Sequence, residues 1–293
     1  MRRFYTILVL LVIAISSNAQ NEIIDGVVVD SVTKEALAFA NIYVLNTTLG
    51  TTSNENGYFQ LEEPNAGQNL RFGYVGYNSK DITYVNKHMD TIFLSSNKEQ
   101  LNEVVVQAPL LDKTIKINGS KSKGKLGISN SGDDEGARII LRYFPKPSEF
   151  KDKAAYLNSA EFFLFKGIGS VKRNYIFRIR IMRLTEDDEP GYDLIDNITL
   201  TGRPGSKILV DLEQERILIP ENGFLIGVEG LQIDQNYIRT SKLLLENGKY
   251  KELKRYGPTF KAVESKDPVY YLSRGEWKKM QMPVPAMNLI ITN

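Results

Sequence analysis

Few residues in this chain have side chains that could carry out chemistry, and they occur singly. The only histidine among the 293 residues is His88, in Asn86-Lys87-His88-Met89-Asp90, and there is no cysteine. A Ser-His-Asp triad would have to use His88, no Gly-x-Ser-x-Gly elbow accompanies it, and zinc peptidases need several ligands at set spacing. The missing cysteines exclude disulfides, thiol catalysis and Cys-ligated metals. We therefore expect His88 to be a surface residue, and we predict no enzyme, no catalytic residue, no cofactor and no metal site.

One stretch imitates a calcium loop. Thr52-x-Asn54-x-Asn56-Gly57, with Glu63 further on, follows part of the EF-hand pattern. Its first position is Thr instead of Asp, and its flanks read as strands, so we interpret it as a polar turn with Gly57 at positive φ. Two acidic loops could also offer oxygens and keep calcium as an alternative: Asp133-Asp134-Glu135 and Glu186-Asp187-Asp188-Glu189.

Aromatic residues near the C-terminal end are the candidates for ligand binding. Tyr270, Tyr271 and the sole tryptophan, Trp277, precede a proline-rich stretch. Aromatic rings often serve as platforms for sugars, although most aromatic side chains pack in a core or at its rim. We name these three residues as the predicted ligand-binding site.

The composition is that of an ordinary globular protein, with 42% hydrophobic and 25% charged residues. The length suggests two domains. The 37 basic and 35 acidic residues nearly cancel to a net charge of +2, which argues against nucleic acid as a partner.

The N-terminus has the three parts of a secretory signal peptide. Arg2-Arg3 form a basic region, Ile7 to Ile15 an apolar region, and Ser17-Asn18-Ala19 a small-residue cleavage site. The apolar run is shorter than the roughly 20 residues of a membrane span, and no later segment supplies one. We predict a signal peptide over residues 1–19 and an exported protein that is periplasmic, outer-membrane associated or secreted. Without cysteine it cannot be a lipoprotein.

Residues 20–107 are predicted to form a β domain. Short runs rich in β-branched and aromatic residues alternate with turn residues, among them Asn56-Gly57, a strong hairpin signal. The predicted strands are Ile23–Val29, Ala38–Leu45, Gly50–Thr52, Tyr58–Leu61, Asn69–Tyr74, Ser79–Val85, Thr91–Leu94 and Glu103–Val106.

This domain resembles a known family. The matching motifs occur in order along the chain: Gly26-x-Val28-x-Asp30, Ala38 to Val44, Gly50 to Ser53, Asn56 to Phe59, Leu70 to Tyr77, Ile92 to Leu94 and Leu101 to Val106. They are similar to the carboxypeptidase regulatory-like domain. The resemblance implies a seven-stranded β-sandwich of the prealbumin (Ig-like) type without catalytic activity. In Bacteroidetes such domains often precede TonB-dependent outer-membrane receptors.

Residues 108–136 are rich in Lys, Gly, Ser and Asp and are predicted to be a linker, in which Lys123–Ser129 could pair as an edge strand. Residues 137–293 are predicted to form a second, jelly-roll-like β-sandwich. We expect Tyr175–Leu184 to turn Arg178 and Arg180 to solvent and Ile179 and Ile181 to the core. The other predicted strands are Ala137–Tyr143, Tyr156–Phe165, Asp193–Leu200, Lys207–Asp211, Phe224–Glu229, a meander of Ser241–Leu245, Tyr250–Lys254 and Thr259–Val263, and a last strand, Met287–Thr292.

The second sandwich resembles modules appended to secreted Bacteroidetes proteins, which are similar to carbohydrate-binding modules. The resemblance rests on three segments: Phe177–Ile181, Glu189–Leu194 and Ile219–Glu229. We predict a non-enzymatic cell-envelope binding or assembly protein, with an outer-membrane or envelope protein or a glycan as its partner. Two alternatives stay open: a carbohydrate-binding protein that uses the second sandwich, and a partner subunit of an outer-membrane receptor.

Overall fold

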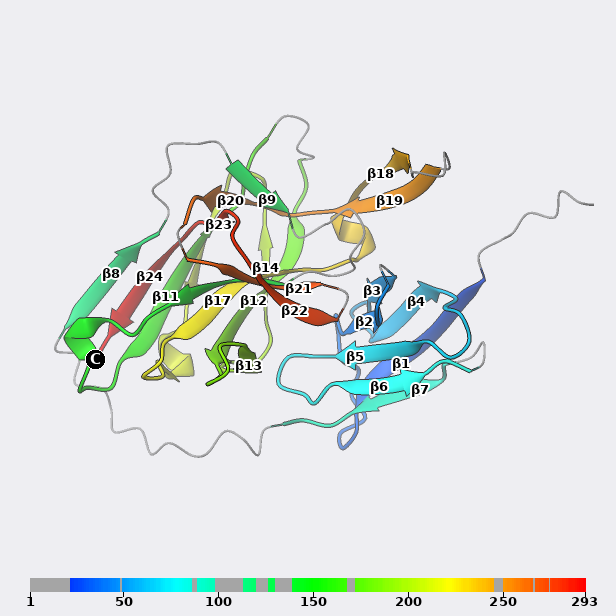
Figure 1. Ribbon diagram of the computed structural model, residues 1–293, viewed down its shortest axis with the longest axis horizontal. Coiled ribbons are helices and arrows are strands. Elements are labelled where there is room, and N and C mark those ends of the chain that lie inside the picture. The colour runs from blue at the N-terminus through cyan, green and yellow to red at the C-terminus, as the bar shows by residue number, and fades with distance from the viewer. Residues whose placement is uncertain are drawn as a thin grey trace, which may run out of the picture.

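The computed structural model describes residues 22–47, 49–85, 89–97, 113–119, 126–129, 139–167, 172–244, 250–265, 267–273 and 275–293. Four predicted features lie outside these residues: the signal peptide, His88 itself, the segment Leu101–Val106 and the acidic loop 133–135. The described part consists of strands and short 3-10 turns, with two sandwiches side by side in Figure 1. It confirms the predicted all-β class.

The first domain is a sandwich of two sheets with strand orders β4-β1-β7 and β3-β2-β5-β6. The strands are β1 (Ile23–Asp30), β2 (Asn41–Val44), β3 (Gly50–Thr52), β4 (Tyr58–Glu62), β5 (Asn69–Gly73), β6 (Lys80–Thr83) and β7 (Thr91–Leu94). Their alternate residues meet in one core, where the rings of Phe59 and Phe72 pack edge to face with centroids 5.7 Å apart. The seven strands that the sequence predicts within residues 22–97 are therefore all present.

The turn at Asn56-Gly57 is not a β-hairpin. It has the predicted turn chemistry, because the Asn54 side-chain oxygen accepts the amides of Asn56 and Tyr58 at 2.9 and 3.1 Å and Gly57 has φ +72°. However, β3 and β4, on either side of it, belong to the two opposite sheets. Asn-Gly favours a tight reversal, but which sheet the next strand joins depends on distant partners. The same hydrogen bonds show that the stretch from Thr52 forms a turn and not an EF-hand loop.

The second domain packs a seven-stranded sheet, order β13-β12-β17-β10-β21-β22 with β14 beside β12, against a five-stranded sheet, order β15-β11-β24-β8 with β16 beside β11. A third sheet, β23-β20-β9, joins them, and β18 and β19 form a separate hairpin. The strands are β8 (Thr114–Asn118), β9 (Leu126–Ser129), β10 (Ile139–Phe144), β11 (Tyr156–Phe163), β12 (Tyr175–Leu184), β13 (Pro190–Asp193), β14 (Ile198–Gly202), β15 (Lys207–Asp211), β16 (Ile217–Leu218), β17 (Phe224–Gly230), β18 (Tyr237–Leu244), β19 (Tyr250–Tyr256), β20 (Thr259–Val263), β21 (Val269–Ser273), β22 (Glu276–Met280), β23 (Val284–Pro285) and β24 (Met287–Thr292).

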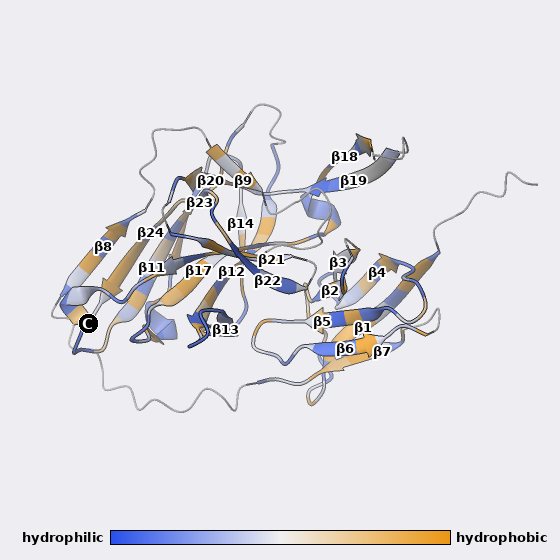
Figure 2. Ribbon diagram, viewed as in Figure 1, coloured by the Kyte–Doolittle hydropathy of each residue, from blue (hydrophilic) through white to orange (hydrophobic). Residues whose placement is uncertain are grey.

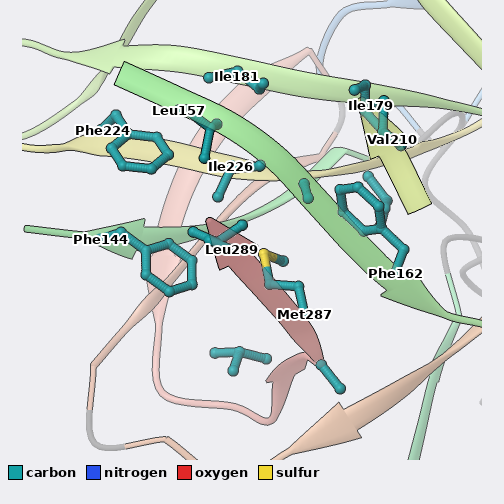
Figure 3. Close-up of a cluster of buried hydrophobic side chains, with 14 of the residues drawn as sticks. Phe144, Leu157, Phe162, Ile179, Ile181, Val210, Phe224, Ile226, Met287 and Leu289 are labelled. Atoms are coloured by element: carbon teal, nitrogen blue, oxygen red, sulfur yellow. The ribbon is translucent and has the colours of Figure 1, made fainter. Parts of the chain in front are cut away.

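The core of this domain lies between the two large sheets. Figure 3 shows Leu157 and Leu289 facing Ile181 and Ile226, and all four are at most 1% exposed. Figure 2 shows that the central and outer strands of the seven-stranded sheet differ in hydropathy. β17 is mostly hydrophobic, whereas β13 and β22, at the two sides of the sheet, are mostly hydrophilic. Each large apolar side chain buried in this way stabilises the fold by roughly 1.5–3 kcal/mol.

Three predictions about this domain need correction. The predicted linker contains β8, which pairs with β24 and packs Ile115 and Ile117 on the core, and also β9, which pairs with β20 as the expected edge strand. The predicted strand Asp193–Leu200 is two strands, β13 and β14, both paired with β12. The predicted meander ends at β19, because β20 leaves the hairpin for the third sheet. The predicted last strand is confirmed as β24.

Candidate functional site

The site lies where the first domain covers the outer face of the seven-stranded sheet. Arg178 and Arg180 of β12 were predicted to face solvent, but Arg178 is 0% exposed and Arg180 only 8%. The Arg178 guanidinium donates to the backbone oxygen of Phe39, in the first domain, at 2.8 Å. Alternation along a strand separates its polar from its apolar face, but it does not say whether water or another domain meets the polar face.

The buried arginines are neutralised by two carboxylates. Glu229 of β17 is 0% exposed, and its oxygens accept from Arg178 and from Arg180, each at 3.0 Å. Arg180 also forms a two-pronged pair with Asp193 of β13, with both N···O distances 2.7 Å. Asn41 of the first domain donates to Glu229 as well. Two positive and two negative groups thus balance, which is what makes their removal from water tolerable.

The buried charges shift the pKa values of Glu229 and of Tyr43. Burial alone would raise the pKa of Glu229, but the guanidinium groups of Arg178 and Arg180 and the bond from Asn41 outweigh it and hold that pKa below its usual value. Burial, helped by the charge of Glu229, raises the pKa of Tyr43 beside the network. Glu229 is therefore ionised and Tyr43 neutral at physiological pH.

Further contacts surround this network. Asn197 accepts from Arg178 at 2.5 Å and donates to the hydroxyl of Tyr74, in the first domain, at 2.9 Å. On the other side, Arg71 of β5 donates to the backbone oxygen of Gly275, in the β21–β22 turn, at 3.2 Å. Gly275 has φ +79°, and a Cβ there would come within 2.6 Å of Leu45. The two sandwiches are therefore joined by directional bonds on both sides of the buried charges.

A cleft of about 260 Å³ opens between the domains beside this network. The second domain contributes part of β10, β12, β13, β21 and β22, and the first domain contributes β2, β5 and the loop after β5. Several aromatic and polar side chains line it: Tyr43, Tyr74, Tyr77, Tyr192, Trp277, Arg71, Ser79 and Asn97. The combination of rings and hydrogen-bonding groups suits a ligand that has both an apolar face and hydroxyl groups.

Of the three aromatic residues predicted to bind a ligand, only Trp277 lines this cleft. It pairs with Leu272 across β21–β22 and packs, half-buried, on an apolar cluster of the sheet's outer face. Tyr270 belongs to that cluster, is 3% exposed and bonds Asp188 at 2.5 Å, so it offers no open ring. Tyr271 points to the other side, against the main core. Adjacent strand residues face opposite ways, so Tyr270 and Tyr271 cannot form one platform.

Two tyrosines of the first domain, Tyr74 and Tyr77, line the cleft and were not among the predicted site residues. Tyr74 and Tyr77 pack edge to face at 5.3 Å, and the Tyr77 hydroxyl donates to Asp30 at 2.6 Å, which fixes the pair. Burial and that bond raise the pKa of Tyr77. The only available signal was the pair of tyrosines in Leu70–Tyr77, a stretch read for its family motif alone. Their place in a cleft with Trp277 follows from the docking of the two domains, which the alternation pattern of a strand does not predict.

Metal binding gains no support in the described residues, which hold no cluster of three or more His, Asp or Glu side chains. In the loop Glu186–Glu189, Asp188 is already engaged by Lys279 and by Tyr270, and these bonds lower its pKa. No helix in the described residues is long and apolar enough to cross a membrane.

Comparison with known proteins finds one family match, in the N-terminal part of the chain. The model of the CarboxypepD_reg-like domain family matches residues 24–106. The chain is also 30% identical over 116 residues to TonB-dependent receptor P3 of Formosa agariphila; the match covers 40% of this chain and only 12% of that protein.

Two solved structures show weaker likeness. A mutant type II cohesin–X-dockerin complex from Acetivibrio cellulolyticus covers 26% of this chain and 58% of its own, with 16% identity and a TM-score of 0.23. The clostridial cysteine protease Cwp84 after propeptide cleavage covers 84% and 51%, with 9% identity and a TM-score of 0.38. The family match, in contrast, confirms the motifs read from the sequence: the first sandwich is a carboxypeptidase regulatory-like domain, a non-catalytic Ig-like module, in a protein with a relative among TonB-dependent receptors.

Proposed function

We propose that this is a non-enzymatic protein of the cell envelope that binds a saccharide in the cleft between its two sandwiches. The observation that carries the proposal is the cleft of about 260 Å³ with Trp277 on one wall and Tyr74 and Tyr77 on the other. The envelope setting is supported by the relative among TonB-dependent receptors.

The lining fits the chemistry of sugars. A sugar ring has an apolar face of C–H groups, which packs on an aromatic ring, and an edge of hydroxyls, which needs directional partners. Trp277, half-buried and fixed on the sheet, supplies a ring, and Arg71, Ser79 and Asn97 supply polar groups. The volume lies below the ~300–1,000 Å³ of drug-sized sites, so a single sugar or the end of a glycan chain fits better than a long polymer.

The buried charges beside the cleft support the same proposal. Because Arg178 donates to Phe39 and Glu229 accepts from Asn41, the two walls are joined and the cleft exists before a ligand arrives. When a site is preformed, no binding free energy is lost to ordering the two domains around the ligand.

The test is a glycan array, followed by titration of any glycan that binds. We expect Trp277→Ala to weaken binding about fivefold or more, because loss of an aromatic stacking contact costs on the order of 1–3 kcal/mol. Tyr250→Ala is the matched control: Tyr250 lies on the β18–β19 hairpin, outside the cleft, and is 66% exposed. Absence of glycan binding, or equal affinity of the Trp277→Ala variant and the native protein, would reject the proposal.

A second candidate function, a partner subunit of an outer-membrane receptor, is favoured by the match to TonB-dependent receptor P3. The first domain offers an edge for strand addition at β7, the last strand of the order β4-β1-β7, where Phe93 is 40% exposed. Affinity isolation from envelope fractions with Phe93→Lys as the comparison tests it. If the native protein and the Phe93→Lys variant recover the same receptor, the β7 edge is not the docking site. If the native protein recovers no outer-membrane protein, it is not a partner subunit of a receptor.

A further inference from the structure

A second, larger cleft of about 570 Å³ lies on the second sandwich. It sits between the β11–β12 connection and the β14–β15 turn. Its lining is Lys166, Gly167, Lys172, Arg173, Asn174, Arg203 and Pro204, of which four are cationic and none is acidic. It shares no residue with the saccharide cleft.

The concentration of positive charge is local. The lining residues, together with Lys207 at the start of β15, supply five basic side chains and no acidic one, in a chain whose charges otherwise nearly cancel. Other arginines of the second domain, such as Arg178 and Arg180, have carboxylate partners. Within the described residues, the four cations of this cleft form no ion pair. The acid on the neighbouring turn is Asp234, which is exposed.

The two arginines are held in place by neutral oxygens. Arg203 donates through Nε to the Asn174 side chain at 2.8 Å. Arg173 donates through one terminal nitrogen to the backbone oxygens of Tyr237 and Gln235, at 2.8 and 3.3 Å. Each guanidinium has five N–H donors, so several remain for a ligand in either case. Carbonyl and amide oxygens orient these groups without cancelling their charge, as a carboxylate would.

From these observations we infer that the cleft is a binding site for a compact ligand with two or more anionic groups, such as sulfate, phosphate or carboxylate. Arginine forks match the paired oxygens of these groups, and the lysines add charge without a fixed direction. The volume lies within the range of small-molecule sites. Nucleic acid is disfavoured because the lining has no aromatic ring on which a base could stack.

The β18–β19 hairpin extends the positive field of the cleft. It begins at Tyr237, whose carbonyl holds Arg173, and its segment 237–256 contains six basic and two acidic residues. Arg239, Lys242 and Lys254 on it are exposed. Such a field raises the rate at which an anion arrives, and salt screens it within roughly 10 Å at 0.1 M ionic strength.

The test is calorimetric titration of the purified protein with three probes: pyrophosphate, a sulfated disaccharide and a uronic acid trimer, each at low and high salt. We expect at least one probe to bind, more weakly at high salt, and Arg173→Gln/Arg203→Gln to weaken it at least tenfold. Since Arg173 and Arg203 also bond to neighbouring loops, a second variant, Lys166→Gln/Lys172→Gln, removes two charges without removing any described hydrogen bond. It should weaken binding in the same direction.

The control with the same change of charge is Lys151→Gln/Lys153→Gln, at two exposed positions after β10. It should bind as the native protein does. Binding of none of the probes, or equal weakening by the control, would overturn the inference. The ranking of the three probes identifies which anion is recognised. Trp277→Ala should leave this binding unchanged, so failure of the saccharide proposal and failure of this inference can be told apart.

Discussion

At the scale of single residues, Glu229 has the greatest consequence for the structure. It is fully buried, it neutralises both Arg178 and Arg180, and it accepts from Asn41 of the first domain. A buried ion pair adds little net stability compared with apolar packing, but removing one partner leaves an uncompensated charge. One side chain thus controls both the stability of the protein and the contact between its domains.

Replacing Glu229 with Gln should therefore lower the free energy of unfolding by about 3–5 kcal/mol. Urea denaturation measures it. The control is Glu221→Gln: Glu221 is 76% exposed on its side chain and pairs with Lys146, so its loss should cost no more than about 1 kcal/mol. Equal effects of the two substitutions would contradict the buried network.

The pH dependence of stability follows from the same carboxylate. The folded pKa of Glu229 is depressed below its unfolded value of about 4.3, so the folded protein binds this proton less readily than the unfolded chain. Its contribution to stability is complete above the unfolded pKa and is lost as the pH falls through the folded pKa. Denaturation measured from pH 7 down to pH 3 should show this loss in the native protein and a smaller one in Glu229→Gln. Identical pH profiles would show that another group is responsible.

At the scale of elements, β8 shows how a strand can escape notice in the sequence. Thr114–Asn118 reads TIKIN, with two apolar residues amid a stretch rich in Lys, Gly and Ser, and it therefore looked like part of a linker. In the structure, Ile115 and Ile117 pack on the core of the second sandwich, beside β24. Two alternating residues are too few to separate a strand from a polar segment when its partner is far away in the sequence.

If β8 is part of the second sandwich, Ile117→Ala should lower the free energy of unfolding by about 1–3 kcal/mol. This is less than the loss at a fully buried isoleucine, because Ile117 is only half-buried. Lys116→Ala, on the exposed face of the same strand, should change stability by less than about 0.5 kcal/mol. Chemical denaturation of both variants measures these changes. If neither substitution lowers the free energy of unfolding, the segment behaves as a linker and not as a strand of the sandwich.

The bounds of the strands could be predicted from the sequence better than the contacts that their side chains make. Strands β3, β7, β12, β15, β20 and β24 begin and end at the predicted residues, because alternation and turn residues are local signals. Whether Arg178 meets water or another domain, and whether Tyr270 or Trp277 remains accessible, depends on contacts between segments far apart in the chain. Of the residues that line the cleft, only Trp277 was therefore predicted from the sequence, and the tyrosines that the first domain contributes were not.

At the scale of the whole molecule, the contact between the domains is charged, buried and spread over both sides of the cleft. Domains within one chain often move relative to each other when their interface is small and polar. Here the bonds from Arg178 to Phe39, from Asn197 to Tyr74 and from Arg71 to Gly275 oppose such motion. The sandwiches should behave as one body.

Scanning calorimetry should accordingly show one cooperative unfolding transition for the native protein. Arg178→Ala removes the contact with Phe39 and leaves Glu229 with one arginine fewer, and it should split the transition or broaden it toward two. Lys80→Ala, an exposed change in the first domain, should leave one transition. Two separate transitions in the native protein would show that the domains unfold independently.

The position of β24 has a consequence for folding during synthesis. This strand, Met287–Thr292, lies between β11 and β8 inside its sheet instead of at an edge. During synthesis the ribosome releases residues 139–280 before the strand that must fill the middle of that sheet. Until then β8 lacks its pairing partner, so the first sandwich can fold early while the second must wait. The second sandwich should therefore be intolerant of losing its last few residues, because they supply the middle strand of its five-stranded sheet.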